Sequence, residues 1–182
     1  LDYYIRAAQR GDIQATFNAG CCYDSGSGVE QDVDMAFRFY EVAAIGGEPG
    51  AQWQVGYYYF DGWGSVEQDY AKAVHWFKEA YDNPKGGYEL KSAAYLAICY
   101  QEGLGVVQDY DVAFLYLQEV EDSVDELWNP INAMVLNALG VAYANGLGAE
   151  QDTGLGLNYF RKAVELGSES AKKNLERLQG IR

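Results

Sequence analysis

Residues 146–152 read Gly-Leu-Gly-Ala-Glu-Gln-Asp, and closely similar strings stand at 26–32, 62–69 and 103–109. Each string has a Tyr three residues before its first Gly and a small or apolar residue eleven positions after its Asp. Self-similarity at a fixed period is typical of stacked supersecondary units rather than of one enclosed globule. The sequence therefore predicts a repeat protein, in which surfaces matter more for function than pockets.

Each repeat is predicted to form two helices joined by this motif. Before the motif, apolar residues recur at the spacing of one helix face, as at Val55, Tyr58 and Tyr59. The first Gly of the motif suits a left-handed position that ends the first helix, and the Asp suits the N-cap of the second. A Gly in the middle of three first helices predicts close approach of the partner helix at Gly20, Gly56 and Gly140.

The spacing predicts a single repeat domain over residues 1–182. Its parts are the second helix of a truncated preceding repeat, four repeats and a polar closing helix, with bounds 1–11, 12–47, 48–83, 84–122, 123–167 and 168–182. Because the chain starts at Leu1 and the truncated repeat at 1–11 lacks its first helix, we expect it to be a fragment of a longer chain.

The fourth repeat carries a recognisable set of positions: Leu139, Gly140, Tyr143, Gly146, Gly148, Asp152, Tyr159, Phe160, Lys162 and Ala163. On these residues the chain resembles the Sel-one-like repeat (SLR) family, which is related to the tetratricopeptide repeat. The third repeat is the least regular, with Ala97 for Gly and Tyr116-Leu117 for the aromatic pair. The resemblance implies an all-α fold, a right-handed α/α superhelical solenoid of about four helix-turn-helix repeats plus flanking terminal helices. It also implies an adaptor or scaffold.

Composition narrows the class of partner. Hydrophobic residues make up 49% of the chain, which excludes a disordered protein. The net charge of −14 disfavours nucleic acid and favours a protein or peptide that is basic or carries apolar anchors. No apolar run is long enough for direct membrane insertion. The cysteine pattern leans weakly towards a cytoplasmic location, with a secreted or periplasmic one left open.

The sequence predicts no catalytic set, no cofactor and no metal. The single histidine, His75, has no partner that would complete a triad or a zinc site. Cys22 and Cys99 share a repeat column that predicts burial, so the cysteines are interpreted as small hydrophobes. An acidic cluster is interpreted as a solvated loop: Glu119, Glu121, Asp122, Asp125 and Glu126.

A partner-binding surface is predicted on the first helices, opposite their core stripe. Its residues are Asn18, Cys21, Asp24, Gln54, Tyr57, Phe60, Asp61, Tyr95, Ile98, Gln101, Glu102, Val141 and Asn145, with Trp63 as an anchor at one edge. Tyr57, Phe60, Tyr95 and Ile98 either form an aromatic groove with an acidic rim or pack between neighbouring first helices, and both interpretations stay open. The function predicted is a non-enzymatic interaction scaffold. The alternatives are a structural spacer or self-associating segment and, with less support, a hydrolase-type enzyme.

Overall fold

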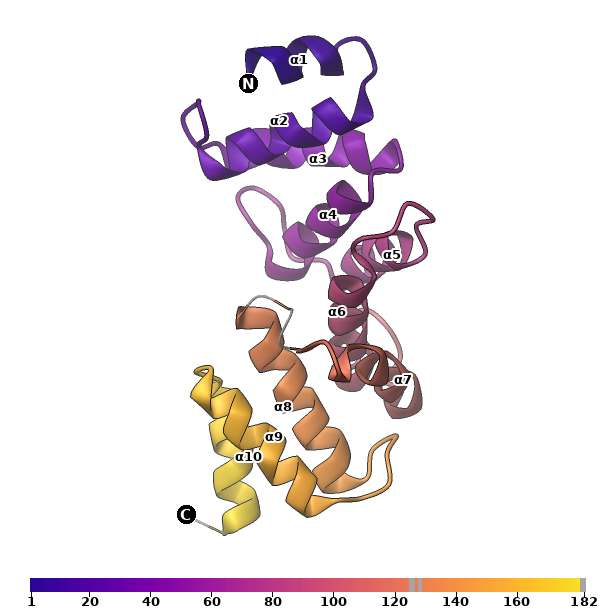
Figure 1. Cartoon of the computed structure of the whole chain (residues 1–182), viewed down its shortest axis with the longest axis vertical. Helices are drawn as coiled ribbons and strands as arrows, with labels where there is room; N and C mark the ends of the chain where they lie inside the picture. Colours follow the sequence, from indigo (N-terminus) through magenta and orange to yellow (C-terminus); the bar gives the residue numbers. More distant parts are fainter. Residues whose placement is uncertain (125–126, 128, 181–182) are drawn as a thin grey trace. The chain divides into compact units, whose positions relative to one another are not determined.

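The computed structural model describes residues 1–124, 127 and 129–180. This part of the chain contains ten α-helices and no β-strand (Figure 1). The helices are α1 (Asp2–Ala8), α2 (Ile13–Ser25), α3 (Val33–Ile45), α4 (Pro49–Asp61), α5 (Tyr70–Tyr81), α6 (Glu89–Glu102), α7 (Tyr110–Glu121), α8 (Asn129–Asn145), α9 (Thr153–Glu165) and α10 (Glu169–Gln179). The all-α class expected from the repeat motif is confirmed.

The chain divides into two compact units, Leu1–Ser92 and Ala93–Arg182, which we call the N-terminal and C-terminal units. In the N-terminal unit α1 packs on α2, α2 on α3, α3 on α4 and α4 on α5. In the C-terminal unit α8 packs on α7 and α9, and α10 packs on both α8 and α9 (Figure 1). Consecutive helices therefore form the layers within each unit, as a repeat architecture requires.

The motif ends one helix and begins the next by the chemistry that its residues predict. Its first Gly adopts a left-handed φ of +68° to +73° in all four copies (Gly26, Gly62, Gly103 and Gly146). The side chain of its Asp accepts a hydrogen bond from the backbone N–H three residues later, at 2.9–3.0 Å, in all four copies (Asp32, Asp69, Asp109 and Asp152). Both predictions for the motif are confirmed.

The Gln that precedes this Asp has a role that the motif analysis missed. Its side-chain N–H donates back to a carbonyl in the last turn of the first helix, at 2.7–2.9 Å, in every copy (Gln31, Gln68, Gln108 and Gln151). Such carbonyls have no partner within the helix, so each Gln satisfies one of them. The recurrence of Gln at this position was the available signal.

Close packing explains the Gly in the middle of the first helices. A Cβ at Gly140 would lie 2.5 Å from the ring of Phe160, and one at Gly20 would lie 2.7 Å from the ring of Tyr40. Gly56 faces the ring of Phe77 in the same way, at 2.8 Å. The predicted close approach is confirmed, and the rings that cause it are fully buried.

The third repeat solves the same packing problem differently. Ala97 stands where the other repeats have Gly, and Leu117 stands where they have the buried aromatic ring. Both side chains are almost completely buried, with exposed fractions of 0% and 1%. A larger residue on the first helix is thus accompanied by a smaller one on the second, which accounts for the irregularity of this copy.

Candidate partner-binding surfaces

In the N-terminal unit the predicted surface residues differ in exposure. Asp61 and Trp63 are exposed, whereas Asn18, Cys21, Asp24, Gln54 and Tyr57 are half-buried. Phe60 is only 8% exposed, and its ring lies against those of Tyr70 and Phe77. Phe60 therefore belongs to the packing between α4 and α5 rather than to an open surface.

In the C-terminal unit the outcome is also mixed. Tyr95 is 3% exposed, so its ring is a packing residue like that of Phe60. Ile98 and Val141 are half-buried, Glu102 and Asn145 are exposed, and Gln101 is buried. These last five residues line hollows described below. Of the four side chains proposed to form an aromatic groove, only Tyr57 and Ile98 are partly exposed.

A row of rings runs along the N-terminal unit, which we call the aromatic row: Trp63, Tyr57, Trp53 and Tyr88. The ring of Tyr57 stacks on Trp53 with a centroid distance of 5.5 Å and lies 6.2 Å from Trp63. Tyr88 lies 6.1 Å from Trp53 at the other end, where Lys91 stands over both rings. Trp63 is 43% exposed, so the row emerges at the surface on the turn after α4.

An acidic residue borders the exposed end of the aromatic row. The Asp61 carboxylate accepts a hydrogen bond from the indole N–H of Trp63 at 3.4 Å. Burial, followed by the hydrogen bond and negative charge of Asp61, raises the pKa of Tyr57 to about 12. Asp61 thus holds the Trp63 ring in place while its own carboxylate remains exposed, which is suited to attracting a cationic side chain.

Asp24 of α2, another residue of the predicted surface, forms hydrogen bonds with α3 and α4. Its carboxylate accepts hydrogen bonds from the hydroxyl of Tyr58 in α4 at 2.9 Å and of Tyr40 in α3 at 3.2 Å. Burial, reinforced by neighbouring negative charge, raises the pKa values of both tyrosines well above their usual range. Asp24 therefore joins the first and second repeats, in addition to its predicted place on the surface.

A corresponding arrangement in the C-terminal unit involves Glu121, the last residue of α7. Its carboxylate accepts hydrogen bonds from the hydroxyls of Tyr143 in α8 and Tyr159 in α9. The interpretation of Glu121 as part of a solvated loop was therefore wrong, because a charge run alone does not show which of its members meets a hydrogen-bond donor from another helix. Asp125 and Glu126 of that cluster lie outside the described residues.

The first-helix face of the C-terminal unit is hollow. Two adjoining hollows of about 630 and 210 Å³ share Gln101, Glu102, Asn137 and Ser170. Five amide side chains line them (Gln101, Gln108, Asn137, Asn145 and Asn174), and we call this feature the amide groove. Sequence reasoning missed Asn137 and Asn174, since neither occupies a repeat column that had been assigned to the surface.

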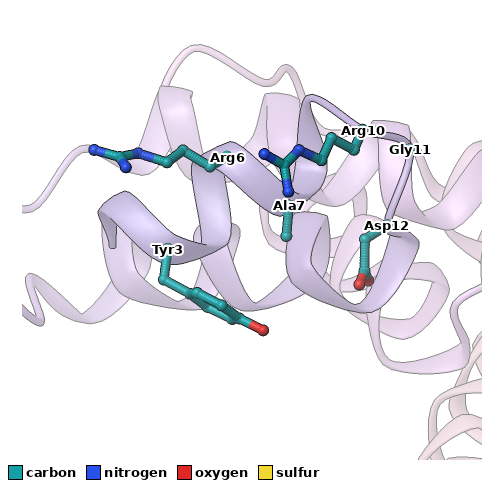
Figure 2. A pocket seen from close by; sticks show the side chains of 6 residues that line it. All are labelled: Tyr3, Arg6, Ala7, Arg10, Gly11 and Asp12. Carbon is teal, nitrogen blue, oxygen red and sulfur yellow. The ribbon is translucent and has the colours of Figure 1, made fainter.

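A third hollow is lined by residues of α1 and of the turn that follows it. Figure 2 shows the side chains of Arg6 and Arg10 on one side of the helix and those of Tyr3 and Asp12 on the other. Arg6 is paired with Asp2 at 2.8 Å, and Asp12 caps α2 through the N–H of Ala15. These charges already have partners or point apart, so the hollow does not bring together groups that would recognise one ligand.

The histidine and the cysteines are the remaining candidates for chemistry. His75 is exposed and its ring lies beside that of Trp76. Cys99 is fully buried, which raises the pKa of its thiol to about 12, and Cys22 is half-buried. The described residues contain no group of three His, Cys, Asp or Glu side chains placed to hold a metal ion. Within the same residues, no helix combines the length and apolarity needed to cross a membrane.

The chain matches the pattern of one known family, the Sel1 repeat, at residues 1–12, 13–48, 49–84, 90–119 and 133–168. The chain belongs to the Sel1 repeat family. This confirms the resemblance inferred from the motif. Sel1 repeat proteins generally mediate protein–protein interactions.

Two named proteins are similar to this chain in sequence. Chitin synthase regulatory factor 4 of Schizosaccharomyces pombe is 40% identical over 81 residues, which are 44% of this chain and 12% of that protein. DAP3-binding cell death enhancer 1 of Mus musculus is 26% identical over 182 residues, which are 100% of this chain and 33% of that protein. The chain thus spans a third or less of the length of these two relatives.

Two solved structures share the fold. A Sel1 repeat protein from Oxalobacter formigenes superposes with a TM-score of 0.72 at 23% identity, over 96% of this chain and 65% of the other. The protein c5321 of uropathogenic Escherichia coli, described as a protective antigen with an SLR fold, gives a TM-score of 0.62 at 26% identity, over 99% of this chain and 44% of the other.

Proposed function

We propose that this Sel1 repeat chain is a non-enzymatic adaptor module that binds a basic protein segment at the exposed end of the aromatic row. The observation that carries the proposal is Trp63, a large ring that is 43% exposed and held in place by Asp61. Aromatic side chains ordered before binding make effective anchors because little rotamer entropy is lost.

The charge of the surface selects the partner. Asp61 is exposed beside Trp63, and the chain as a whole carries a net charge of −14. A segment that places Lys or Arg next to an aliphatic or aromatic side chain would fit both features, with its apolar group on the ring and its cation near the carboxylate. The names of two relatives, a regulatory factor and a DAP3-binding protein, support a role in binding other proteins.

The test is a selection of random twelve-residue peptides displayed on phage, with the 182-residue chain as bait. We expect enriched peptides to combine Lys or Arg with a large apolar residue. Their affinity, measured by fluorescence anisotropy, should fall at least tenfold for the double substitution Tyr57→Ala and Trp63→Ala. Tyr3→Ala, which truncates a ring that is 77% exposed in α1, is the matched control and should leave the affinity unchanged.

A second variant separates charge from packing. Asp61→Asn should weaken binding and reduce its dependence on salt concentration, because one exposed ion pair is lost. If peptides bind equally well to the wild type and to the folded Tyr57→Ala/Trp63→Ala variant, the aromatic row is not the binding surface. A concentration-dependent mass in light scattering would instead support the self-associating or spacer role.

A further inference from the structure

We propose that the amide groove of the C-terminal unit is a second binding site, which holds an extended, lysine- or arginine-containing peptide segment by its main chain. The site involves α6, α8 and α10 and contains none of the residues of the aromatic row. It therefore stands independently of the function proposed above.

The amide side chains of the groove are oriented by hydrogen bonds within the protein. Gln108 donates to the backbone carbonyl of Gln101 at 2.7 Å, Asn145 to that of Val141 at 2.9 Å, and Asn174 to the side chain of Asn137 at 3.0 Å. In each donor amide one N–H is used, and one N–H and the oxygen lone pairs remain. The groove thus presents several fixed amides, each with a donor and an acceptor.

Gln101 brings a buried polar atom without a partner to the wall of the groove. Its side chain is only 4% exposed and lines both hollows. The amide nitrogen makes a 3.4 Å hydrogen bond to the carbonyl of Ala138, but the buried oxygen Oε1 has no hydrogen-bond partner in the described chain. An unsatisfied buried acceptor is costly, about 1–3 kcal/mol, so a turn of the Gln101 side chain that brings Oε1 to a ligand donor in the hollow would be favoured.

The dimensions and charge of the groove indicate the kind of ligand. Its residues on α8 run from Met134 to Asn145, eleven positions (145 − 134), which corresponds to about 16 Å of helix. This length fits about five residues of extended peptide, whose N–H and C=O groups complement side-chain amides. Glu102 is exposed at the groove and the chain is acidic, so a basic segment matches its charge. Arg177 also lines the groove, so Glu102 and the net charge of the chain supply its acidic character.

The probe is an acetylated and amidated six-residue peptide of threonine, alanine and serine with one lysine in the middle. It is titrated into the ¹⁵N-labelled 182-residue chain while the side-chain amide resonances are followed by NMR. We expect saturable shifts of the Gln101, Gln108, Asn145 and Asn174 resonances. The same peptide with N-methylated backbone should bind at least tenfold more weakly, because the main-chain donors are gone.

Matched variants test the residues. Gln108→Ala and Asn145→Ala should each weaken binding roughly three- to tenfold, the effect of one hydrogen bond. Gln151→Ala removes an equivalent helix-end hydrogen bond outside the groove and should leave affinity unchanged. Glu102→Gln should weaken binding of the lysine peptide but not of its norleucine analogue. Equal binding by the N-methylated peptide, an equal effect of Gln151→Ala, or shifts confined to the aromatic row would each overturn the proposal.

Discussion

Helices α4 and α8 hold the same place in two repeats, yet they present different chemistry. The columns that carry Gln54, Tyr57, Phe60 and Asp61 in α4 carry Ala138, Val141, Ala144 and Asn145 in α8. Large rings fill the space beside α4 and emerge as the aromatic row, whereas small side chains leave the hollows of the amide groove beside α8. The motif therefore sets the scaffold, and columns outside the motif set what each unit can bind.

The two units also differ in how one carboxylate joins successive repeats. In the N-terminal unit Asp24 accepts hydrogen bonds from the hydroxyls of Tyr40 and Tyr58, which are almost completely buried. In the C-terminal unit Glu121 accepts hydrogen bonds from the hydroxyls of Tyr143 and Tyr159, which are half-buried. Water can replace a lost acceptor only where the hydroxyls are accessible, so the two carboxylates should differ in their contribution to stability.

The largest expected effect tests this difference. Asp24→Ala leaves two buried hydroxyls without their acceptor and should lower the free energy of unfolding by about 2–4 kcal/mol. Glu121→Ala should cost less, about 1 kcal/mol, because water reaches its tyrosines. Urea denaturation followed by circular dichroism measures both, with Asp24→Asn as a control that keeps an acceptor oxygen. Equal losses at the two sites would show that burial of the hydroxyls does not decide the cost.

A smaller effect is expected where the repeats differ in core packing. Gly140→Ala places a methyl group 2.5 Å from the Phe160 ring and should destabilise the chain by about 1–2 kcal/mol, despite the better helix propensity of Ala. Adding Phe160→Leu reproduces the Ala97 and Leu117 combination of the third repeat.

A double-mutant cycle then measures the coupling. The Gly140→Ala/Phe160→Leu variant should be more stable than the sum of the two single losses predicts. Purely additive losses would mean that the third repeat does not compensate one substitution with the other.

The smallest expected effect concerns acid sensitivity. The Asp34 carboxylate in α3 accepts a hydrogen bond from the backbone N–H of Ser65 at 2.8 Å, which lowers the pKa of Asp34. A lowered pKa in the folded state stabilises the fold above the unfolded pKa of about 4, and this stabilisation is lost as the pH falls through the folded pKa. Asp34→Asn should therefore make the decline in unfolding free energy below pH 4 shallower.

Asp111 provides the control for this prediction. It holds the position of Asp34 in the first turn of α7, so Asp111→Asn removes the same charge from the same repeat column. Thermal unfolding between pH 2.5 and pH 7 should show little change in acid dependence for Asp111→Asn. An equal change for both variants would indicate a general effect of net charge.

Residues whose role is local were predictable from sequence. The left-handed Gly146, the capping Asp152 and the close approach at Gly140 were all expected from their spacing. Each depends on backbone geometry or on a partner helix that the repeat itself specifies. The same reasoning missed Gln151, because its hydrogen bond runs back to a helix end seven residues earlier.

The candidate surfaces were only partly predictable. The helical period placed Phe60 and Tyr57 on one face, but it could not show that Phe60 is covered by Tyr70 and Phe77 while Tyr57 is half-buried. The period also could not predict the hydrogen bond between the side chains of Asn174 in α10 and Asn137 in α8. Side-chain burial and hydrogen-bond partners depend on residues from other helices, which a period of 3.6 residues does not specify.

The sequence by itself determined the family, the helical class and the helix ends at each motif, because turns, caps and core stripes are encoded within about 40 residues and recur four times. The tertiary structure alone decided that Asp24 and Glu121 accept hydroxyls from two neighbouring helices, that Trp63 emerges from a row of rings and that the face of α8 is hollow. These features arise where side chains of different repeats meet, and their volumes and hydrogen bonds are settled only when the helices pack.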